Sequence, residues 1–182
     1  DFDGTIAHLD VGNTIFTTFT PDELIENGWH RNLIDAWKEG RISSEECLTE
    51  ECRRATFTPA QLDALLDRVP LTAGFVELAA YCRRAGTPVT ILSDGLDYYL
   101  AVLLGKYGLS DIEYHANHLF FENGCAEVSF PYAGKGCGRC GNCKRWHIDR
   151  LRRDGERVIY VGDGYSDRFA IRSADVIFAR RD

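Results

Sequence analysis

The stretch Asp1-Phe2-Asp3-Gly4-Thr5 opens the chain with two carboxylates two residues apart, followed at once by a glycine and a threonine. Alternating residues of an extended segment point in opposite directions, so both carboxylates can share a site only where the chain turns. Gly4 permits that turn. A carboxylate can act as a nucleophile and a second carboxylic acid as a proton donor, so Asp1 and Asp3 are candidate catalytic residues.

Three later segments place polar residues where an apolar run ends or a helix begins. Ser93-Asp94-Gly95 follows the apolar residues 88–92, and Lys144 begins a helical pattern. Gly162-Asp163-Gly164-Tyr165-Ser166-Asp167 follows the apolar residues 158–161. Open α/β sheets bind ligands at the carboxyl ends of their strands. The pattern therefore predicts that these segments meet near Asp1 and Asp3.

Strand and helix patterns alternate over the last two thirds of the chain. Short apolar runs typical of buried parallel strands lie between helical patterns; strands are expected at 88–93, 157–161 and 176–178, and helices at 72–84, 97–107, 144–153 and 167–172. One or two further strands are expected within 112–130, around a turn at 122–124. This order predicts an α/β fold, with a Rossmann-like parallel sheet and helices on both faces.

Residues 20–70 carry helical patterns only, with helix starts expected at Thr20, Ser44 and Thr58; Thr72 is the start expected for the next helix. The helical block separates the first acid pair from the rest of the α/β pattern. We therefore expect a small helical cap inserted after the first strand, over residues 12–70. Residues 1–11 and 71–182 would form the catalytic core.

Composition limits the classes of function. The net charge of −7 and the pI of about 5.2 argue against a general nucleic-acid binder, which needs a basic face. No apolar run approaches the ~18 residues of a membrane span. Seven cysteines, an odd number, favour a reducing compartment, and with no signal-peptide pattern we expect the cytoplasm. Since methionine is absent and only Phe2 precedes Asp3 as an apolar residue, we expect further residues before Asp1, and others after the last strand.

Three cysteines at repeated spacing, Cys137, Cys140 and Cys143, form a pattern typical of metal sites. The pattern predicts a structural Zn²⁺, with a fourth ligand from Cys125, His147 or His115. A disulfide, or a loop of free thiols, is the alternative. Because Lys144 follows Cys143 directly, a clamp in this loop would position the lysine.

The chain contains an acid pair, a hydroxyl, a lysine and a second acid pair, in this order. This order resembles the signature of the haloacid dehalogenase superfamily. The chain looks like a magnesium-dependent phosphatase of that superfamily. The resemblance implies that Asp1 forms an aspartyl-phosphate and that Asp3 is the general acid and base. It also implies that Asp1, the Asp3 carbonyl and Asp163 hold Mg²⁺, while Asp167 orients Lys144 or a metal-bound water. Ser93, Asp94 and Gly95 would hold the phosphate, and Lys144 would offset its charge.

The sequence indicates the substrate less clearly than it indicates the type of reaction. Asp1 to Ile6, Asn142-Cys143-Lys144 and Phe178-Ala179-Arg180 resemble the helical-cap branch that includes phosphoserine phosphatases and the 2-hydroxy-3-keto-5-methylthiopentenyl-1-phosphate phosphatases of methionine salvage. The cysteine-rich loop and residues 160–164 also resemble phosphoethanolamine and phosphocholine phosphatases. His8 and Asp10, just after the acid pair, are candidate substrate contacts.

The expected partner is a small phosphate ester, with no nucleic acid and no membrane, and the oligomeric state stays open. A non-catalytic binding or regulatory protein on the same fold is the alternative from another class. The intact set of six polar residues (Asp1, Asp3, Ser93, Lys144, Asp163 and Asp167) argues against it.

Overall fold

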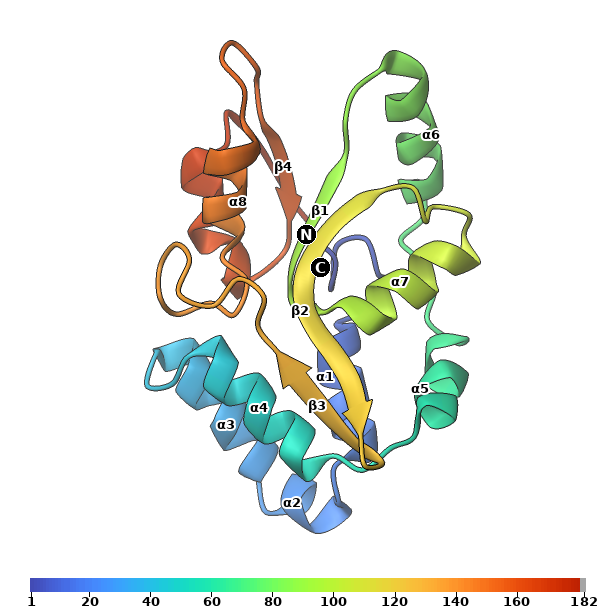
Figure 1. The fold of residues 1–182 in the computed structure, drawn as a ribbon, viewed down its shortest axis with the longest axis vertical. Helices are drawn as coiled ribbons and strands as arrows, with labels where there is room; N and C mark the ends of the chain where they lie inside the picture. The colour runs from blue at the N-terminus through green and yellow to red at the C-terminus, as the bar shows by residue number, and fades with distance from the viewer. Residues whose placement is uncertain (181–182) are drawn as a thin grey trace.

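A computed structural model describes residues 1–180 (Figure 1). Its larger sheet contains β1 (Thr90–Leu96), β2 (Glu113–Glu122) and β3 (Cys125–Ser129), in that order. β1 and β2 run parallel, whereas β2 and β3 form an antiparallel hairpin around Asn123 and Gly124. A second parallel pair contains β4 (Ile159–Gly162) and β5 (Val176–Ala179). The predicted α/β class is confirmed, with one antiparallel strand added to the parallel arrangement.

The N-terminal residues lie between the two strand groups (Figure 1). The backbone nitrogen of Asp1 donates to the carbonyl of Val161 in β4 at 3.0 Å. Phe2 is fully buried, and its carbonyl accepts hydrogen bonds from the amides of Thr5, Ile6 and Ala7. The chain therefore turns sharply at once after the first carboxylate, as the glycine at position 4 predicts.

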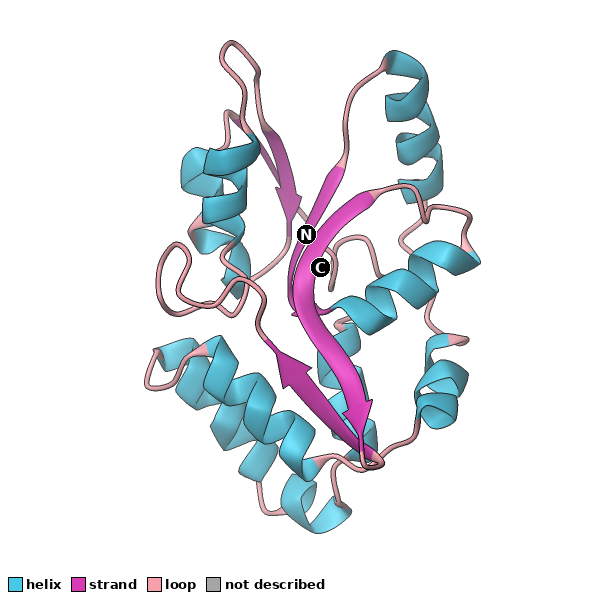
Figure 2. Cartoon of the chain, in the orientation of Figure 1, coloured by secondary structure: helices cyan, strands magenta, loops and turns pink. Residues whose placement is uncertain are grey.

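Helices flank the strands (Figure 2). They are α1 (Val11–Phe19), α2 (Asp22–Glu26), α3 (Trp29–Glu39), α4 (Ser44–Arg54), α5 (Pro59–Leu66), α6 (Phe75–Ala85), α7 (Asp97–Lys106) and α8 (Lys144–Leu151), with 3-10 helices η1 (Tyr165–Arg168) and η2 (Ala170–Ser173). None of the helices within residues 1–180 has the length and apolar character needed to cross a membrane.

Two of the four expected helix starts follow from capping boxes. α4 begins at Ser44 as expected, capped by Ser43 together with Glu46, and Thr58 caps α5 together with Gln61. The start expected at Thr20 is wrong, because Thr20 ends α1 and α2 has no side-chain cap. The start expected at Thr72 is also wrong: its hydroxyl donates to the Thr5 carbonyl at 2.7 Å, and α6 begins after Gly74.

One apolar core joins the helical block to the larger sheet. It contains fully buried residues from several elements, among them Ile15 of α1, Leu62 of α5, Ile91 of β1 and Leu100 of α7. A smaller cluster of Leu92, Ile148, Tyr160 and Ala170 packs α8 against β4 and η2. The division into a core and a cap of residues 12–70 stays a prediction, since α1 and α5 share the core of β1.

Candidate active site

Lys144 is the centre of a buried polar group at the N-terminus of α8. Only 3% of the residue is exposed, and its Nζ donates to Asp1 Oδ1 at 2.5 Å and to Asp167 Oδ1 at 2.7 Å. Ser166 Oγ accepts a third hydrogen bond at 2.8 Å. Burial alone would lower the pKa of Lys144, but neighbouring Tyr160 and Asp167 outweigh it and raise that pKa above its usual value. The lysine is therefore a fixed positive charge beside Asp1.

Asp163 lies across from Asp1 at the end of β4. The Thr5 hydroxyl is 3.3 Å from Asp1 Oδ2 and 3.3 Å from Asp163 Oδ1. Gly4 has φ +66°, and a Cβ at this position would lie 2.2 Å from Asp163 Oδ2. The turn after the acid pair thus approaches Asp163 so closely that only glycine fits.

Carboxylate oxygens of Asp1, Asp163 and Asp167 lie within 4.8 Å of one another. Asp167 is already engaged, because it accepts hydrogen bonds from Lys144, from the Tyr160 hydroxyl and from the amides of Asp163 and Gly164. Burial raises the pKa of Asp167, but Lys144 outweighs this and lowers it overall. Asp1 and Asp163 are left to face a cation, and their oxygens are the ligands that Mg²⁺ prefers. The residues fit the predicted metal.

The Asp3 side chain lies outside this group of carboxylates. Its Oδ1 accepts from the Val11 amide at 2.9 Å, and its Oδ2 accepts from the hydroxyls of Tyr99 at 2.6 Å and Ser93 at 3.3 Å. Burial, followed by the nearby charge of Asp10, raises the pKa of Asp3 to about 6. A carboxyl group with this pKa carries a proton in part of the molecules near neutral pH, as a general acid requires.

Ser93, Asp94 and Gly95 lie in the second half of β1, and the side chains of Ser93 and Asp94 face different partners. Ser93 Oγ donates to Asp3 and accepts from the Gly95 amide at 3.0 Å. The Asp94 carboxylate accepts from Ser44 Oγ at 2.6 Å and from the Asn142 amide at 2.8 Å. Burial raises the pKa of Asp94. Asp94 therefore connects β1 to α4 and to the cysteine loop, residues 137–143.

His8 and Asp10 have local partners. His8 is exposed, and its Nδ1 lies 3.3 Å from one guanidinium nitrogen of Arg180. The other terminal nitrogen of Arg180 donates to Thr72 Oγ1 at 3.0 Å. Asp10 is the N-cap of α1 and accepts from the Asn13 amide at 2.8 Å. In the described part of the chain, neither side chain joins the group around Lys144. Their expected role in substrate binding stays a prediction.

A pocket adjoins the lysine between the helical block and the core. Trp37, Ser44, Asp94, Arg139, Tyr165 and Arg168 lie in its wall, together with Ser166. Trp37 makes an edge contact with Tyr165 at 5.2 Å between ring centroids, and its indole N–H donates to Ser44 Oγ at 2.9 Å. Because Ser166 also contacts Lys144, this pocket lies beside the buried polar group.

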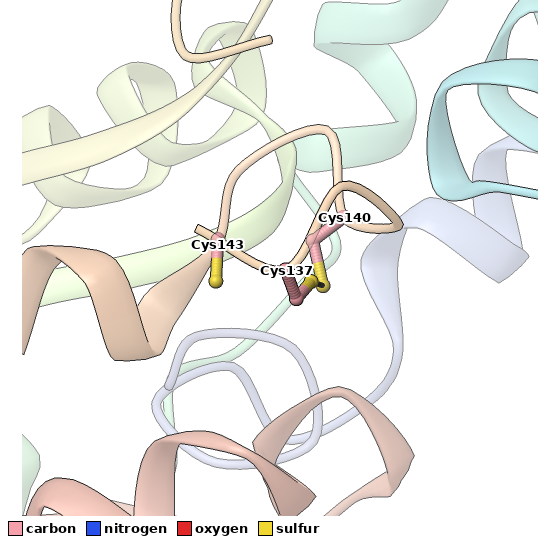
Figure 3. Close-up of side chains that lie close together, drawn as sticks. All are labelled: Cys137, Cys140 and Cys143. Carbon is pink, nitrogen blue, oxygen red and sulfur yellow. Dashed lines mark hydrogen bonds between the residues drawn. The ribbon is translucent and has the colours of Figure 1, made fainter. Parts of the chain in front are cut away.

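The cysteine loop brings three thiols together (Figure 3). The sulfurs of Cys137, Cys140 and Cys143 lie within 4.8 Å of one another, and Cys137 and Cys140 are 3.4 Å apart. Among residues 1–180, none of the expected fourth ligands joins them. His147 Nε2 faces Asn142 Oδ1 at 2.5 Å, His115 Nδ1 faces the Tyr132 hydroxyl at 2.9 Å, and Cys125 begins β3.

Asn142 is a site residue that sequence reasoning missed. It is fully buried, and its side-chain amide donates to the carbonyls of Ser93 at 2.7 Å and His115 at 2.8 Å. Burial lowers the pKa of His147 to about 4, so at neutral pH the uncharged ring donates to Asn142 Oδ1. One side chain thus fixes the end of β1 against β2 and α8. The sequence carries no signal for this role, because the partners are distant along the chain.

We expect Asn142→Ala to lower the free energy of unfolding by about 3 kcal/mol, because it leaves two buried carbonyls without donors. Urea denaturation measures this loss. Asn32→Ala, an exposed change on α3, is the matched control and should stay within about 0.5 kcal/mol of the parent. Equal stabilities of the two variants would contradict the role given to Asn142.

A buried lysine between two aspartates, with a third aspartate directly after β4, places a carboxylate beside a fixed positive charge. The comparison with known families agrees. The chain belongs to the haloacid dehalogenase-like hydrolase family, whose model matches residues 1–172. The resemblance inferred from the sequence is confirmed.

Several relatives share nearly the whole chain. It is 32% identical to the 2-hydroxy-3-keto-5-methylthiopentenyl-1-phosphate phosphatase of Geobacillus thermodenitrificans, over 99% of this chain and 80% of that one. The protein of the same name from Lysinibacillus sphaericus is 28% identical, over 99% and 79%. A solved structure of phosphoserine phosphatase, as a phospho-aspartyl intermediate analogue, has a TM-score of 0.71 at 20% identity, over 98% of this chain and 83% of that one. That likeness confirms the fold.

Proposed function

We propose that the chain is a magnesium-dependent phosphomonoester hydrolase that acts on a small phosphorylated metabolite through an aspartyl-phosphate on Asp1. The observation that carries the proposal is the buried contact of Lys144 with Asp1 and Asp167, next to Asp163. Such a site offers an ionised carboxylate nucleophile beside positive charge, which is what phosphoryl transfer requires. The phosphatase names of the relatives support it.

In the first half of the reaction an Asp1 carboxylate oxygen attacks phosphorus, and the bond from phosphorus to the ester oxygen breaks. Asp3 gives its proton to the departing alkoxide. Lys144 keeps Asp1 ionised and offsets the charge of the phosphate. A Mg²⁺ held by Asp1, the Asp3 carbonyl and Asp163 would supply further positive charge to the phosphate oxygens.

In the second half, Asp3 takes a proton from water, and the water oxygen attacks phosphorus of the acyl-phosphate. Inorganic phosphate leaves and the Asp1 carboxylate is restored. We assign Ser93 a part in both halves, because its hydroxyl contacts Asp3. Zinc has no part in these steps, and a Zn²⁺ on the cysteine loop would act on structure alone.

The substrate within this proposal is 2-hydroxy-3-keto-5-methylthiopentenyl-1-phosphate of methionine salvage, supported by the names of relatives up to 32% identical. Phosphoserine, phosphoethanolamine and phosphocholine are the competing esters. We place the reaction in the cytoplasm, on the ground of the odd number of cysteines.

The test is release of phosphate from a panel of these four esters and p-nitrophenyl phosphate, with Mg²⁺ and with excess chelator. We expect Mg²⁺-dependent hydrolysis, with the methionine-salvage ester giving the highest kcat/KM. Absence of hydrolysis of every ester in the presence of Mg²⁺ would instead favour a non-catalytic protein on this fold.

The pocket beside Ser166 predicts where specificity arises, because its wall includes Trp37 of the proposed cap. We expect Trp37→Leu to lower kcat/KM for the preferred metabolite by about tenfold or more, while p-nitrophenyl phosphate loses much less. Trp29→Leu, on the same helix but outside the pocket wall, is the control. Equal proportional losses for both substrates would show that Trp37 supports the fold rather than substrate choice.

A further inference from the structure

The three thiols of the cysteine loop have the spacing of ligands around one tetrahedral metal ion. With a Zn–S distance of about 2.3 Å, two thiolates on one tetrahedral zinc are separated by about 3.8 Å. Cys137 and Cys140 are 3.4 Å apart, and all three sulfurs lie within 4.8 Å of one another. Small movements of the side chains therefore suffice to place all three on one ion. Figure 3 shows Cys143 to one side of Cys137 and Cys140.

The backbone of the loop is shaped to hold the thiols together. Gly136 has φ +73°, and a Cβ there would lie 2.5 Å from the sulfur of Cys143. Cys143 is 1% exposed and precedes the first residue of α8, so its position is fixed by the helix. Cys137 and Cys140 are half-buried, which leaves the group open to water on one side.

The residues between the thiols connect different parts of the molecule. The Arg139 carbonyl accepts a hydrogen bond from the Ser44 amide, at the first residue of α4, at 2.8 Å. Asn142 holds the end of β1 through Ser93 and Asp94. Lys144 follows Cys143 directly. Fixing the three thiols would therefore fix α4, β1 and the buried lysine relative to one another.

We propose that Cys137, Cys140 and Cys143 bind one Zn²⁺ as thiolates, that water takes the fourth position, and that the ion holds the cysteine loop between α4 and α8. Thiolates are ligands that zinc accepts readily, and binding releases one proton from each thiol. The proposal is independent of the phosphatase reaction, because the ion lies on a loop and not among the carboxylates around Lys144.

The direct test is elemental analysis of the full chain, produced in zinc-containing medium and purified with reductant and without added metal. We expect about one zinc per chain. Cobalt added to the metal-free protein should give the absorption of a thiolate-bound tetrahedral ion. Because both measurements are made on the unmodified chain, neither depends on a variant that folds.

Single variants locate the ion. Cys137→Ser and Cys140→Ser should each lower the zinc content about fivefold or more. Cys82→Ser, a half-buried thiol on α6, and Cys125→Ser, outside the group, should keep it. In the metal-free protein the Ser44 amide should exchange its hydrogen faster, because the Arg139 carbonyl that it contacts is no longer held.

Two results on the unmodified protein would overturn the proposal. One is reduced protein that contains no zinc, takes up no cobalt and has all three thiols open to titration in the native state. The other is a disulfide between Cys137 and Cys140 in native protein whose reduced form still takes up no metal. Loss of zinc from Cys125→Ser would also contradict it, because Cys125 would then be a ligand.

Discussion

Asp1→Asn should abolish turnover, with kcat for p-nitrophenyl phosphate falling at least about a thousandfold in the presence of Mg²⁺. An amide cannot form the acyl-phosphate, so the reaction loses its covalent intermediate. Lys144 keeps its contacts with Asp167 and Ser166, so we expect the fold to persist. Steady-state kinetics measures the loss, and thermal unfolding checks that the variant is folded.

Asp35→Asn on the exposed side of α3 is the matched control and should retain the parent activity. Near-normal kcat in Asp1→Asn would mean that another group attacks phosphorus, or that water does so directly. Asp3→Asn should behave differently from both. It should still allow phosphorylation of Asp1 by an ester with a good leaving group, but slow the release of phosphate.

Lys144→Met should affect stability as well as activity. The methionine fills similar space, but it leaves the carboxylates of Asp1 and Asp167 buried without their cation. We expect the free energy of unfolding to fall by about 3–5 kcal/mol at neutral pH, and kcat/KM to fall about a hundredfold or more. Without the lysine, the pKa of each carboxyl rises, so the loss of stability should shrink as the pH is lowered. Urea denaturation between neutral and acidic pH measures this.

A double variant separates the two effects of the lysine. Lys144→Met combined with Asp167→Asn removes one of the unpaired charges and should recover part of the stability. It should not recover activity, because the charge beside Asp1 is still missing. If the double variant is no more stable than Lys144→Met alone, the pair of Lys144 with Asp167 is not the source of the loss.

The sequence predicted those features that depend on neighbouring residues. Apolar runs ahead of Ser93 and Gly162 marked strands, and Asp163 and Asp167, which follow Gly162, lie close to Asp1. Helix starts were predicted well where the two residues of a capping box bond to each other's backbone, as Thr58 and Gln61 do. The helix start predicted at Thr72 was wrong because the Thr72 hydroxyl donates a hydrogen bond to Thr5, 67 positions away, and does not cap a helix.

The missed residues depend on contacts across the fold. In the sequence, Tyr99 looks like an ordinary buried aromatic residue of a helix. In the structure, its hydroxyl donates a hydrogen bond to Asp3. Asn142 reads as one more polar residue of a glycine-rich loop, although it joins β1, β2 and α8. Asp10 caps α1, and its expected contact with the substrate stays a prediction. Neither the role of Tyr99 nor that of Asn142 is set by spacing along the chain.

The central claim is that phosphate passes through Asp1. The most direct measurement is acid quenching of Asp3→Asn after brief mixing with Mg²⁺ and phosphate-labelled p-nitrophenyl phosphate. The account predicts covalent label on the peptide that contains Asp1, stable in acid and released by hydroxylamine, and no label when Asp1→Asn is added to the same chain. Label on another residue, or activity in the parent enzyme without any trapped intermediate in this variant, would contradict it.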